Sequence, residues 1–375
     1  MGRYLNPGME SFEKSVNSEI YVDKTGLVGY TNRVMNTVQG YVCVSRPRRF
    51  GKSMAANMLT AYYSRGCDSR EIFSKFEISE SLDFEKYRNK YNTIFLNMQE
   101  FLSRSDSVEA LVDRVKKLVL RDLKREYPDV DYFDDTDLVE SMQDIYETEK
   151  CPFVVIIDEW DCIFREFRQN KEAQEKYLDF LRDLLKDKAC IHLAYMTGIL
   201  PIKKYGTHSA LNMFDEFSMI NPGPLAPYVG FTEVEVEYLC HKYRMDMEEV
   251  KAWYDGYSFD GVPSVYSPRS VVNSMLFGKI ENYWNQTETF EALQVYIDMN
   301  FDGLKDDVLS MIAGERIPVN TGSFTNDMTT FRTEDDVLTL LIHLGYLAYD
   351  SENKVVKIPN NEVRNEYVNS VAASD

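Results

Sequence analysis

The chain has 375 residues, more than one average domain contains, so we predict two domains. Hydrophobic residues make up 44% of the chain and aromatic residues 13%, which is enough for a packed core and excludes a largely disordered protein. The 42 basic and 61 acidic residues give a formal net charge of −19, which argues against a broad nucleic-acid-binding face and against binding to an anionic membrane.

Strand-like and helix-like segments alternate between residues 40 and 220. Apolar residues at helical spacing predict helices after Ser53, after a Ser107 N-cap, and before Leu185. Short apolar runs predict the strands GYVCVS (40–45), NTIFLNM (92–98), FVVII (153–157), CIHLAYM (190–196) and EFSMI (216–220). This alternation predicts an α/β fold whose sheet is mostly parallel and doubly wound.

A proline-rich segment marks the predicted domain boundary. NPGPLAP (221–227) holds three prolines in seven residues, a composition typical of a connection between elements. We therefore predict a first domain over residues 1–220, with the segment 1–39 packing on it, and a second domain over residues 221–375.

The second predicted domain is mainly helical. Helices are expected in TEVEVEYLCHKY (232–243), behind a Thr cap, and in two segments that follow it. Thr333 with Asp336 resembles a capping box at the start of a helix that ends at Gly345. The stretch 345–359 then predicts a hairpin. Helices followed by a two-stranded wing indicate a winged-helix-like module.

The first predicted strand runs directly into SRPRRFGKS (45–53), which resembles a phosphate-binding loop. Arg46 stands where the pattern G-x-x-x-x-G-K-[ST] has its first glycine, although the eight-residue length is kept. In such a loop, backbone N–H groups and a helix N-terminus surround a polyanion. Gly51 permits close approach, Lys52 reaches the β- and γ-phosphates, and Ser53 offers a hydroxyl to Mg²⁺. A basic turn without a nucleotide is the alternative interpretation.

The segment FVVIIDEWD (153–161) supplies the second half of a nucleotide site. Asp158 follows a continuous apolar strand, so its carboxylate is expected at the edge of the sheet where ligands of open α/β folds bind. We expect Asp158 to hold Mg²⁺ and Glu159 to orient or deprotonate the attacking water. An acidic strand end on an ordinary surface is the alternative, but a loop, a lysine, a hydroxyl and an acid pair in this order favour the nucleotide site.

Other polar residues are weaker candidates. Thr197 ends the fourth predicted strand and is a candidate sensor of the γ-phosphate, or else a turn residue before Gly198. Arginines suit bidentate phosphate contacts, although loop arginines are equally often solvated. The expected nucleotide contacts are Arg46, Arg48, Arg49, Phe50, Gly51, Lys52, Ser53, Met54 and Asp158. Arg269 in YSPRS is interpreted as a surface residue.

Together the motifs resemble the bacterial AAA-ATPase-like family. The resemblance is carried, in chain order, by IYVDKTGLV (20–28), SRPRRFGKS (45–53), IIDEWD (156–161), WYDGYSF (253–259) and IPNNEVR (358–364). A loop without its first glycine is itself a trait of that family. The resemblance implies a P-loop NTPase with an extra strand between the loop strand and the acidic strand.

Carried over by position, the resemblance makes Lys52 the loop lysine and Ser53 the metal-binding hydroxyl. Asp158 and Glu159 become the metal-binding and water-activating acids. Members of the family often continue into a PD-(D/E)XK nuclease-like domain. Because the sequence ends at Asp375, we expect that domain to be absent here.

The leading hypothesis is therefore an Mg²⁺-dependent ATPase that acts as a conformational switch on a protein partner or an appended domain. A nucleotide-gated interaction module with negligible turnover is the alternative, and a small-molecule P-loop kinase is a third. An arginine finger supplied in trans would require an oligomer. With no C-x-x-C among six cysteines, no signal-peptide core and no membrane-length apolar run, we expect a cytoplasmic protein.

Overall fold

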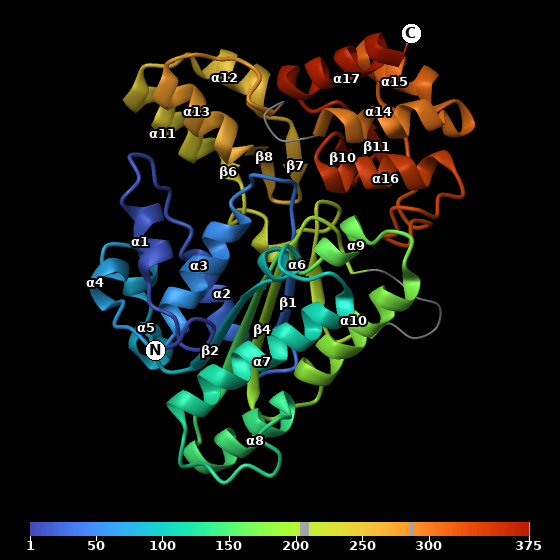
Figure 1. Cartoon of the computed structure of the whole chain (residues 1–375). Helices are drawn as coiled ribbons and strands as arrows, with labels where there is room; N and C mark the ends of the chain where they lie inside the picture. Colours follow the sequence, from blue (N-terminus) through green and yellow to red (C-terminus); the bar gives the residue numbers. More distant parts are fainter. Residues whose placement is uncertain (203–209, 285–288, 375) are drawn as a thin grey trace. The chain divides into compact units, whose positions relative to one another are not determined.

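The computed structural model describes residues 1–202, 210–284 and 289–374 (Figure 1). These residues form two compact units. Unit 1 comprises Met1–Val44, Lys52–Gly198 and residues 210–216. Unit 2 comprises Ser45–Gly51, residues 199–202 and the described residues from 217 onward. The chain thus passes from unit 2 to unit 1 inside the predicted phosphate loop. The predicted boundary after residue 220 is a single cut in the chain, whereas each unit is built from several segments.

A five-stranded sheet organises the first half of the chain. Its strands lie in the order β2-β3-β4-β1-β5, and both β2–β3 and β3–β4 pair in parallel. The predicted extra strand is present, because β4 lies between the loop strand β1 and the acidic strand β3. The strand bounds are β1 Tyr41–Ser45, β2 Asn92–Asn97, β3 Phe153–Asp158, β4 Ile191–Gly198 and β5 Asp215–Phe217. The α/β fold class is confirmed.

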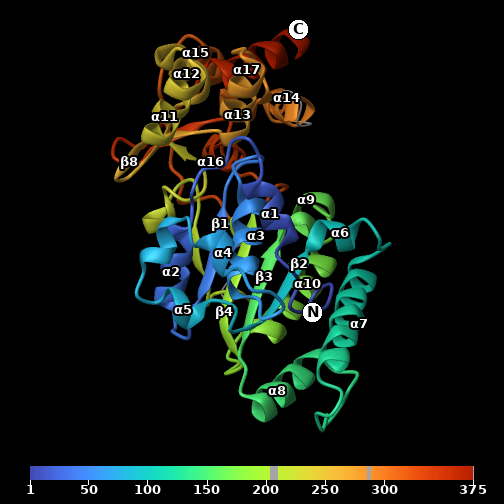
Figure 2. The same cartoon turned by 90° about the vertical axis from the view of Figure 1, so that its left-hand side faces the viewer.

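Helices cover both faces of this sheet. Helix α3 (Lys52–Tyr63) packs on β2, β3 and β4, and Figure 2 shows it on the opposite side of the sheet from α7 (Val108–Glu126). Ser107 caps α7 as predicted, since its side chain accepts from the Ala110 N–H at 3.1 Å. The remaining helices are α4 Arg70–Phe73, α5 Phe84–Tyr87, α6 Met98–Leu102, α8 Leu138–Glu149, α9 Cys162–Glu166 and α10 Lys171–Leu185.

The N-terminal segment belongs to unit 1. Helices α1 (Glu10–Val16) and α2 (Gly26–Val34) both pack on α3. The chain before them is fixed by the buried carboxylate of Asp122 on α7, which accepts from the Tyr4 N–H at 2.7 Å and the Leu5 N–H at 3.1 Å.

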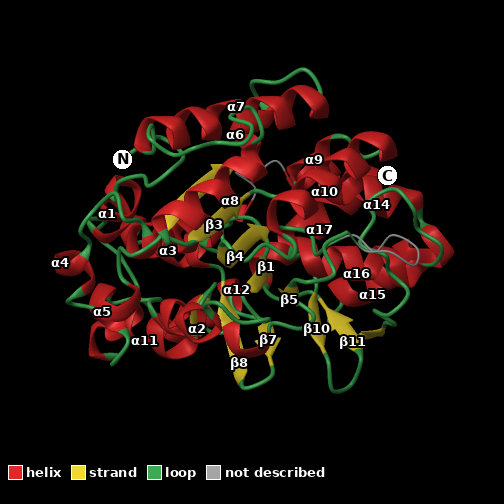
Figure 3. Cartoon of the chain, turned by 90° about the horizontal axis from the view of Figure 1, so that it is seen from below, coloured by secondary structure: helices red, strands yellow, loops and turns green. Residues whose placement is uncertain are grey.

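Unit 2 combines helices with two small sheets, β6-β8-β7 and β10-β11-β9 (strands yellow in Figure 3). The predicted hairpin is present, because β10 pairs antiparallel with β11. The helices are α11 Glu233–Tyr243, α12 Met247–Tyr254, α13 Pro268–Phe277, α14 Thr289–Met299, α15 Leu304–Ile312, α16 Glu334–Leu344 and α17 Asn361–Ser374. The strands are β6 Phe231–Thr232, β7 Tyr257–Phe259, β8 Val262–Tyr266, β9 Ile317–Pro318, β10 Ala348–Asp350 and β11 Val355–Lys357.

The ends of α16 show one correct and one wrong prediction. Gly345 ends the helix in the left-handed conformation, with φ 87°, as expected. The Thr333–Asp336 capping box is wrong, because Thr333 makes no side-chain cap bond. The Asp336 carboxylate instead accepts from the Ser323 hydroxyl and the Arg332 N–H. Among the described helices, none is both long and apolar enough to cross a membrane.

Candidate nucleotide-binding site

Asp158 lies at the carboxyl end of β3, a strand with a neighbour on each side. Its register partners are Asn97 on β2 and Thr197 on β4. Every residue of β3 is buried, and Asp158 itself is only 2% exposed. The continuous apolar run therefore delivers a carboxylate to the edge at which open α/β sheets bind ligands.

The Ser53 hydroxyl donates to the Asp158 carboxylate at 2.7 Å. This bond joins the first turn of α3 to the end of β3, and so it brings together the two residues predicted to hold the metal. Burial raises the pKa of Asp158, while the hydrogen bond from Ser53 opposes that shift. A hydroxyl beside a carboxylate is an oxygen donor set that suits Mg²⁺.

Metal ligands from the protein alone are few at this position. Within residues 1–202, 210–284 and 289–374, no three Asp, Glu, His or Cys side chains gather as a metal site. A magnesium ion held by Ser53 and Asp158 therefore needs further oxygens from bound phosphate and water, which is how Mg²⁺ binds in nucleotide sites. The residues present fit the ion on those terms.

Lys52 is the first residue of α3, and its side chain is buried. Burial lowers the pKa of Lys52 from 10.5 to about 8, although the carboxylates of Glu159, Asp158 and Asp161 act in the opposite direction. The preceding Gly51 has φ 93°, and nothing lies within 4 Å of the position where a Cβ would stand. The backbone conformation favours glycine at this point, immediately before a helix N-terminus whose first N–H groups lack helical partners.

The acid pair continues into a buried ion-pair network that the sequence analysis missed. Arg165 on α9 pairs with Glu159 and, at 3.3 Å, with Asp161. Asp161 is fully buried, whereas the Glu159 side chain is 29% exposed. Glu159 also has a positive φ of 53°, unusual for a residue with a side chain. The carboxylate predicted to activate water is therefore held by a neighbouring guanidinium.

Thr197 lies opposite Asp158 across the β3–β4 pair, as expected from its place at the strand end. It is fully buried, and its hydroxyl donates to the carbonyl oxygen of Val44 on β1 at 2.9 Å. This hydrogen bond connects β4 to the loop strand. The predicted contact with the γ-phosphate stays a prediction.

Arg46 has a different role from the expected phosphate contact. Its guanidinium is fully buried and donates to the carbonyl oxygens of Phe217 and Ser45 at 2.8 Å each. Longer bonds reach the carbonyl oxygens of Val229 at 3.4 Å and Leu225 at 3.5 Å. All these partners belong to unit 2, so the residue in place of the first glycine holds unit 2 together instead of extending toward a ligand.

The other loop residues divide between the surface and the interior. Arg48 and Arg49 are exposed, and the pKa of Arg49 is lowered by partial burial and by the nearby cations of Arg269 and Arg48. Phe50 is buried against Tyr257, with ring centroids 5.4 Å apart. Met54, on α3, is 42% exposed. An anion beside Arg48, Arg49 and Arg269 would relieve their mutual repulsion.

A family model described as "Predicted AAA-ATPase" matches residues 6–207, more than half of the chain. The chain belongs to this family. The match includes the loop, the acid pair and all of β1 to β4. The resemblance inferred from the motifs is therefore confirmed, and with it the P-loop NTPase class of the matched residues.

One curated relative of this predicted AAA-ATPase matches at low sequence identity. A protein of Azotobacter chroococcum mcd 1, described as uncharacterized and encoded in the vnfD 5' region, is 25% identical over 298 residues. That match covers 75% of this chain and 54% of the relative, so the chain spans about half the length of that protein.

Some solved structures also resemble the chain weakly. The Walker-type ATPase of Pyrococcus abyssi has a TM-score of 0.44 at 14% identity and covers 92% of this chain and 94% of its own. The Aeropyrum pernix ORC2 protein, in its ADPNP–ADP complexes, has a TM-score of 0.36 at 13% identity, covering 95% and 97%. The family assignment rests on the family model and not on these structures.

Proposed function

We propose that this chain binds ATP with Mg²⁺ and hydrolyses it, and that the nucleotide state acts as a conformational switch. The observation that carries the proposal is the 2.7 Å hydrogen bond from the Ser53 hydroxyl to the Asp158 carboxylate. It joins a helix that begins just after a left-handed glycine to the end of a buried acidic strand. Lys52 stands at the same helix start with a depressed pKa.

In this proposal the residues have separate roles toward the triphosphate. The start of α3 offers backbone N–H groups, and Lys52 adds a positive charge to the β- and γ-phosphates. Ser53 and Asp158 hold the magnesium ion, which when bound neutralises charge on the phosphate oxygens. Arg48 and Arg49 are proposed as further phosphate contacts, whereas Arg46 contributes through the fold of unit 2.

In the proposed hydrolysis, Glu159 accepts the proton of the attacking water. A water oxygen forms a bond to the γ-phosphorus, the bond from that phosphorus to the bridging oxygen of ADP breaks, and the proton of the water passes to the Glu159 carboxylate. Because Arg165 pairs with that carboxylate, Glu159 has to share or leave this ion pair before it accepts a proton.

The switch is proposed to act through the loop itself. Ser45–Gly51 belongs to unit 2 and Lys52 to unit 1, so the chain passes from one unit to the other inside the loop. A protein partner, an appended domain or a second copy would then sense the nucleotide state. A cytoplasmic location is part of the same proposal.

A second function, a nucleotide-gated module with negligible turnover, is favoured by one observation. The Glu159 carboxylate is already paired with Arg165, which is in turn held by the buried Asp161. If that arrangement persists with ATP bound, water is not activated. ADP retained through purification, with no phosphate release in any oligomeric state, would identify this module.

Phosphate release from ATP by the wild type, Lys52→Ala and Glu159→Gln tests the proposed function. We expect measurable turnover in the wild type only, with ATP binding retained in Glu159→Gln, because Lys52, Ser53 and Asp158 remain in place. Equal rates for the three proteins would contradict the assignment. Transfer of phosphate to an added metabolite, with none in solution, would indicate a kinase instead.

A further inference from the structure

Helix α7 has a basic face outside the nucleotide site. Its opposite face is apolar and buried, through residues such as Val115 and Val119. At 100° per residue, Lys117, Arg121 and Lys124 fall on the same outward side, and Arg125 flanks them. In the sequence these cations are interrupted by apolar and acidic residues, and only the helical period gathers them.

This face lines a groove of about 630 Å³. Its charged lining contains five cations and two carboxylates, a local charge of +3 on a chain whose net charge is −19. The lining residues are Asp113, Lys116, Lys117, Leu120, Arg121, Lys124, Arg125, Asp135 and Thr136. The charge of the groove is therefore opposite in sign to the net charge of the chain. Leu120 is the single apolar residue in this lining.

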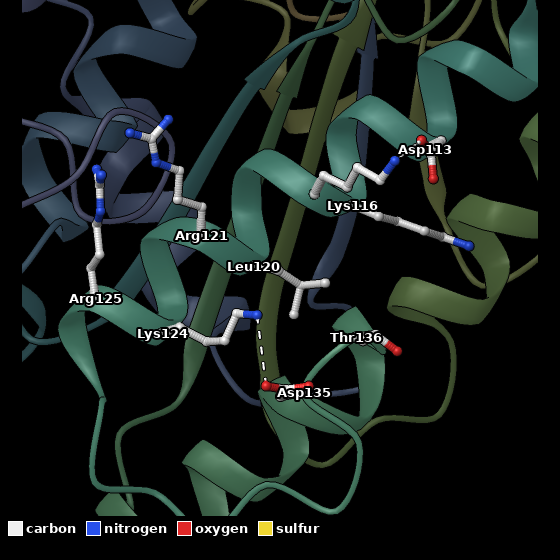
Figure 4. A pocket seen from close by; sticks show the side chains of 9 residues that line it. Asp113, Lys116, Leu120, Arg121, Lys124, Arg125, Asp135 and Thr136 are labelled. Atoms are coloured by element: carbon white, nitrogen blue, oxygen red, sulfur yellow. Dashed lines mark ion pairs between the residues drawn. The ribbon is translucent and has the colours of Figure 1, made fainter.

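The cations of the groove are only partly neutralised. Lys117 pairs with Asp113 at 2.8 Å, and Lys124 reaches Asp135 only at 3.9 Å. Figure 4 shows this longer pair as a dashed line, with Arg121 and Arg125 projecting together from the same side of α7. Neither arginine forms an ion pair with any residue that the structure describes, and both are exposed. Two adjacent guanidinium groups are thus available to an anion.

We propose that this groove on α7 binds the phosphodiester backbone of a nucleic acid. Guanidinium and ammonium groups one helical turn apart suit a row of phosphates, and arginine forks bind phosphate oxygens in pairs. Cations repeated along one helix match the regular phosphates of a nucleic acid better than the irregularly spaced carboxylates of an acidic protein segment. With no aromatic side chain in the lining, bases have no stacking surface, so binding is independent of sequence.

The proposal predicts weak, salt-sensitive binding. Each phosphate neutralised contributes about −0.9 to the slope of log K against log salt on duplex DNA, so about three contacts give a slope of about −3. The groove lies apart from Lys52, Ser53 and Asp158, so this binding does not depend on the proposed ATPase activity. ATP binding stays unchanged when the groove is neutralised.

Fluorescence anisotropy on the full chain at low salt tests the proposal, with labelled duplex DNA, single-stranded DNA, duplex RNA and a poly-glutamate peptide of equal charge as probes. The test variant is Arg121→Gln/Lys124→Gln/Arg125→Gln. We expect its affinity for nucleic acid to be at least about tenfold lower than that of the wild type. The slope of log K against log salt should change from about −3 to about −1. The arms with DNA and RNA identify the favoured strand type.

Two controls distinguish binding at this groove from non-specific attraction by the total charge of the protein. Lys75→Gln/Lys86→Gln/Lys90→Gln removes the same charge from exposed positions elsewhere in unit 1, and we expect it to bind as the wild type does. Arg121→Lys/Arg125→Lys keeps the charge and is expected to retain most of the binding. Equal losses in the groove variant and the Lys75 control, no binding of any nucleic acid, or tighter binding of poly-glutamate would each overturn the proposal. Circular dichroism checks that every variant is folded.

Discussion

Two buried cations stand six positions apart in the loop and are used in opposite ways. Arg46 donates to carbonyl oxygens, which are neutral acceptors, and lies wholly within unit 2. Lys52 lies in unit 1, where the charges of Asp158, Glu159 and Asp161 act on it and its pKa is lowered to about 8. A buried guanidinium whose hydrogen bonds go to backbone carbonyl oxygens stabilises a fold. A buried ammonium group with a shifted pKa among carboxylates is typical of a site that binds a ligand.

The largest effect expected from this comparison is on catalysis. Lys52→Ala should lower kcat/KM for ATP by about a thousandfold, because it removes a charge placed on the transferred phosphate. The free energy of unfolding should change by less than about 1 kcal/mol, since burying an ammonium group is itself unfavourable. Steady-state phosphate release and urea unfolding of the same preparation measure both. A large loss of stability with normal turnover would reverse the roles assigned to the two cations.

Arg46→Ala should show the opposite pattern. Removing the guanidinium leaves several buried carbonyl oxygens without donors, so we expect the free energy of unfolding to fall by about 3 kcal/mol. The matched control is Arg48→Ala in the same loop, which is exposed and should change stability by less than about 0.5 kcal/mol. The midpoints of urea unfolding of the two variants measure this difference. Equal midpoints would contradict a structural role for Arg46.

The depressed pKa of Lys52 gives the next effect, on the pH dependence of binding. Well below pH 8 the lysine is protonated before and after ATP binds, so Lys52 itself adds no pH dependence to the affinity. Above pH 8 the free protein has lost that proton, and a bound triphosphate restores it, so affinity should fall by up to about tenfold per pH unit. Isothermal titration calorimetry in buffers of different ionisation enthalpy would detect the proton uptake. Lys52→Arg stays charged throughout and should show no such fall.

The smallest effects are expected at the exposed arginines. Arg48→Gln and Arg49→Gln should each weaken ATP binding by about three- to tenfold, because solvent screens a single exposed charge. Stability should be unchanged. Because the proposal places both arginines against the phosphates, bound ATP should protect the two side chains from modification by a guanidinium reagent. Unaltered affinity in both variants would limit phosphate recognition to the loop backbone and Lys52.

Much of the fold followed from local patterns in the sequence. The apolar runs placed β1 to β4 within a residue or two, because strands buried on both faces carry few polar residues. The order of loop and acid pair placed Ser53 and Asp158 at one sheet edge, where they are hydrogen-bonded. Short helices such as α9 were not predicted, since five residues are too few to show a helical period.

The features that the sequence did not reveal become visible only once the fold is known. The acceptors of Arg46 are carbonyl oxygens, and Phe217 stands 171 positions away along the chain, so no local pattern marks them. Arg165 did leave a signal, because it stands four residues after Asp161, but that spacing has meaning only once α9 is known to follow the acid pair. The basic face of α7 forms no continuous basic run in the sequence, and only the helical period brings its cations together.

Two motifs on which the predicted resemblance rests lie beyond the matched residues 6–207, and they contact each other. Gly256 of WYDGYSF has φ 119°, and a Cβ there would lie 1.9 Å from the carbonyl oxygen of Pro359 in IPNNEVR. The Asn360 side chain donates to the carbonyl oxygen of Asp255 at 2.6 Å. These two motifs therefore pack against each other within unit 2.

The most direct test of the central claim is the binding of ATP to Glu159→Gln, measured by calorimetry with Mg²⁺ and again with EDTA. This variant keeps Lys52, Ser53 and Asp158 but lacks the proton acceptor, so binding can be followed without turnover. We expect tight binding with Mg²⁺, much weaker binding with EDTA, and none when Lys52→Ala is added. Absence of ATP binding, or binding that ignores both the metal and Lys52, would contradict the account.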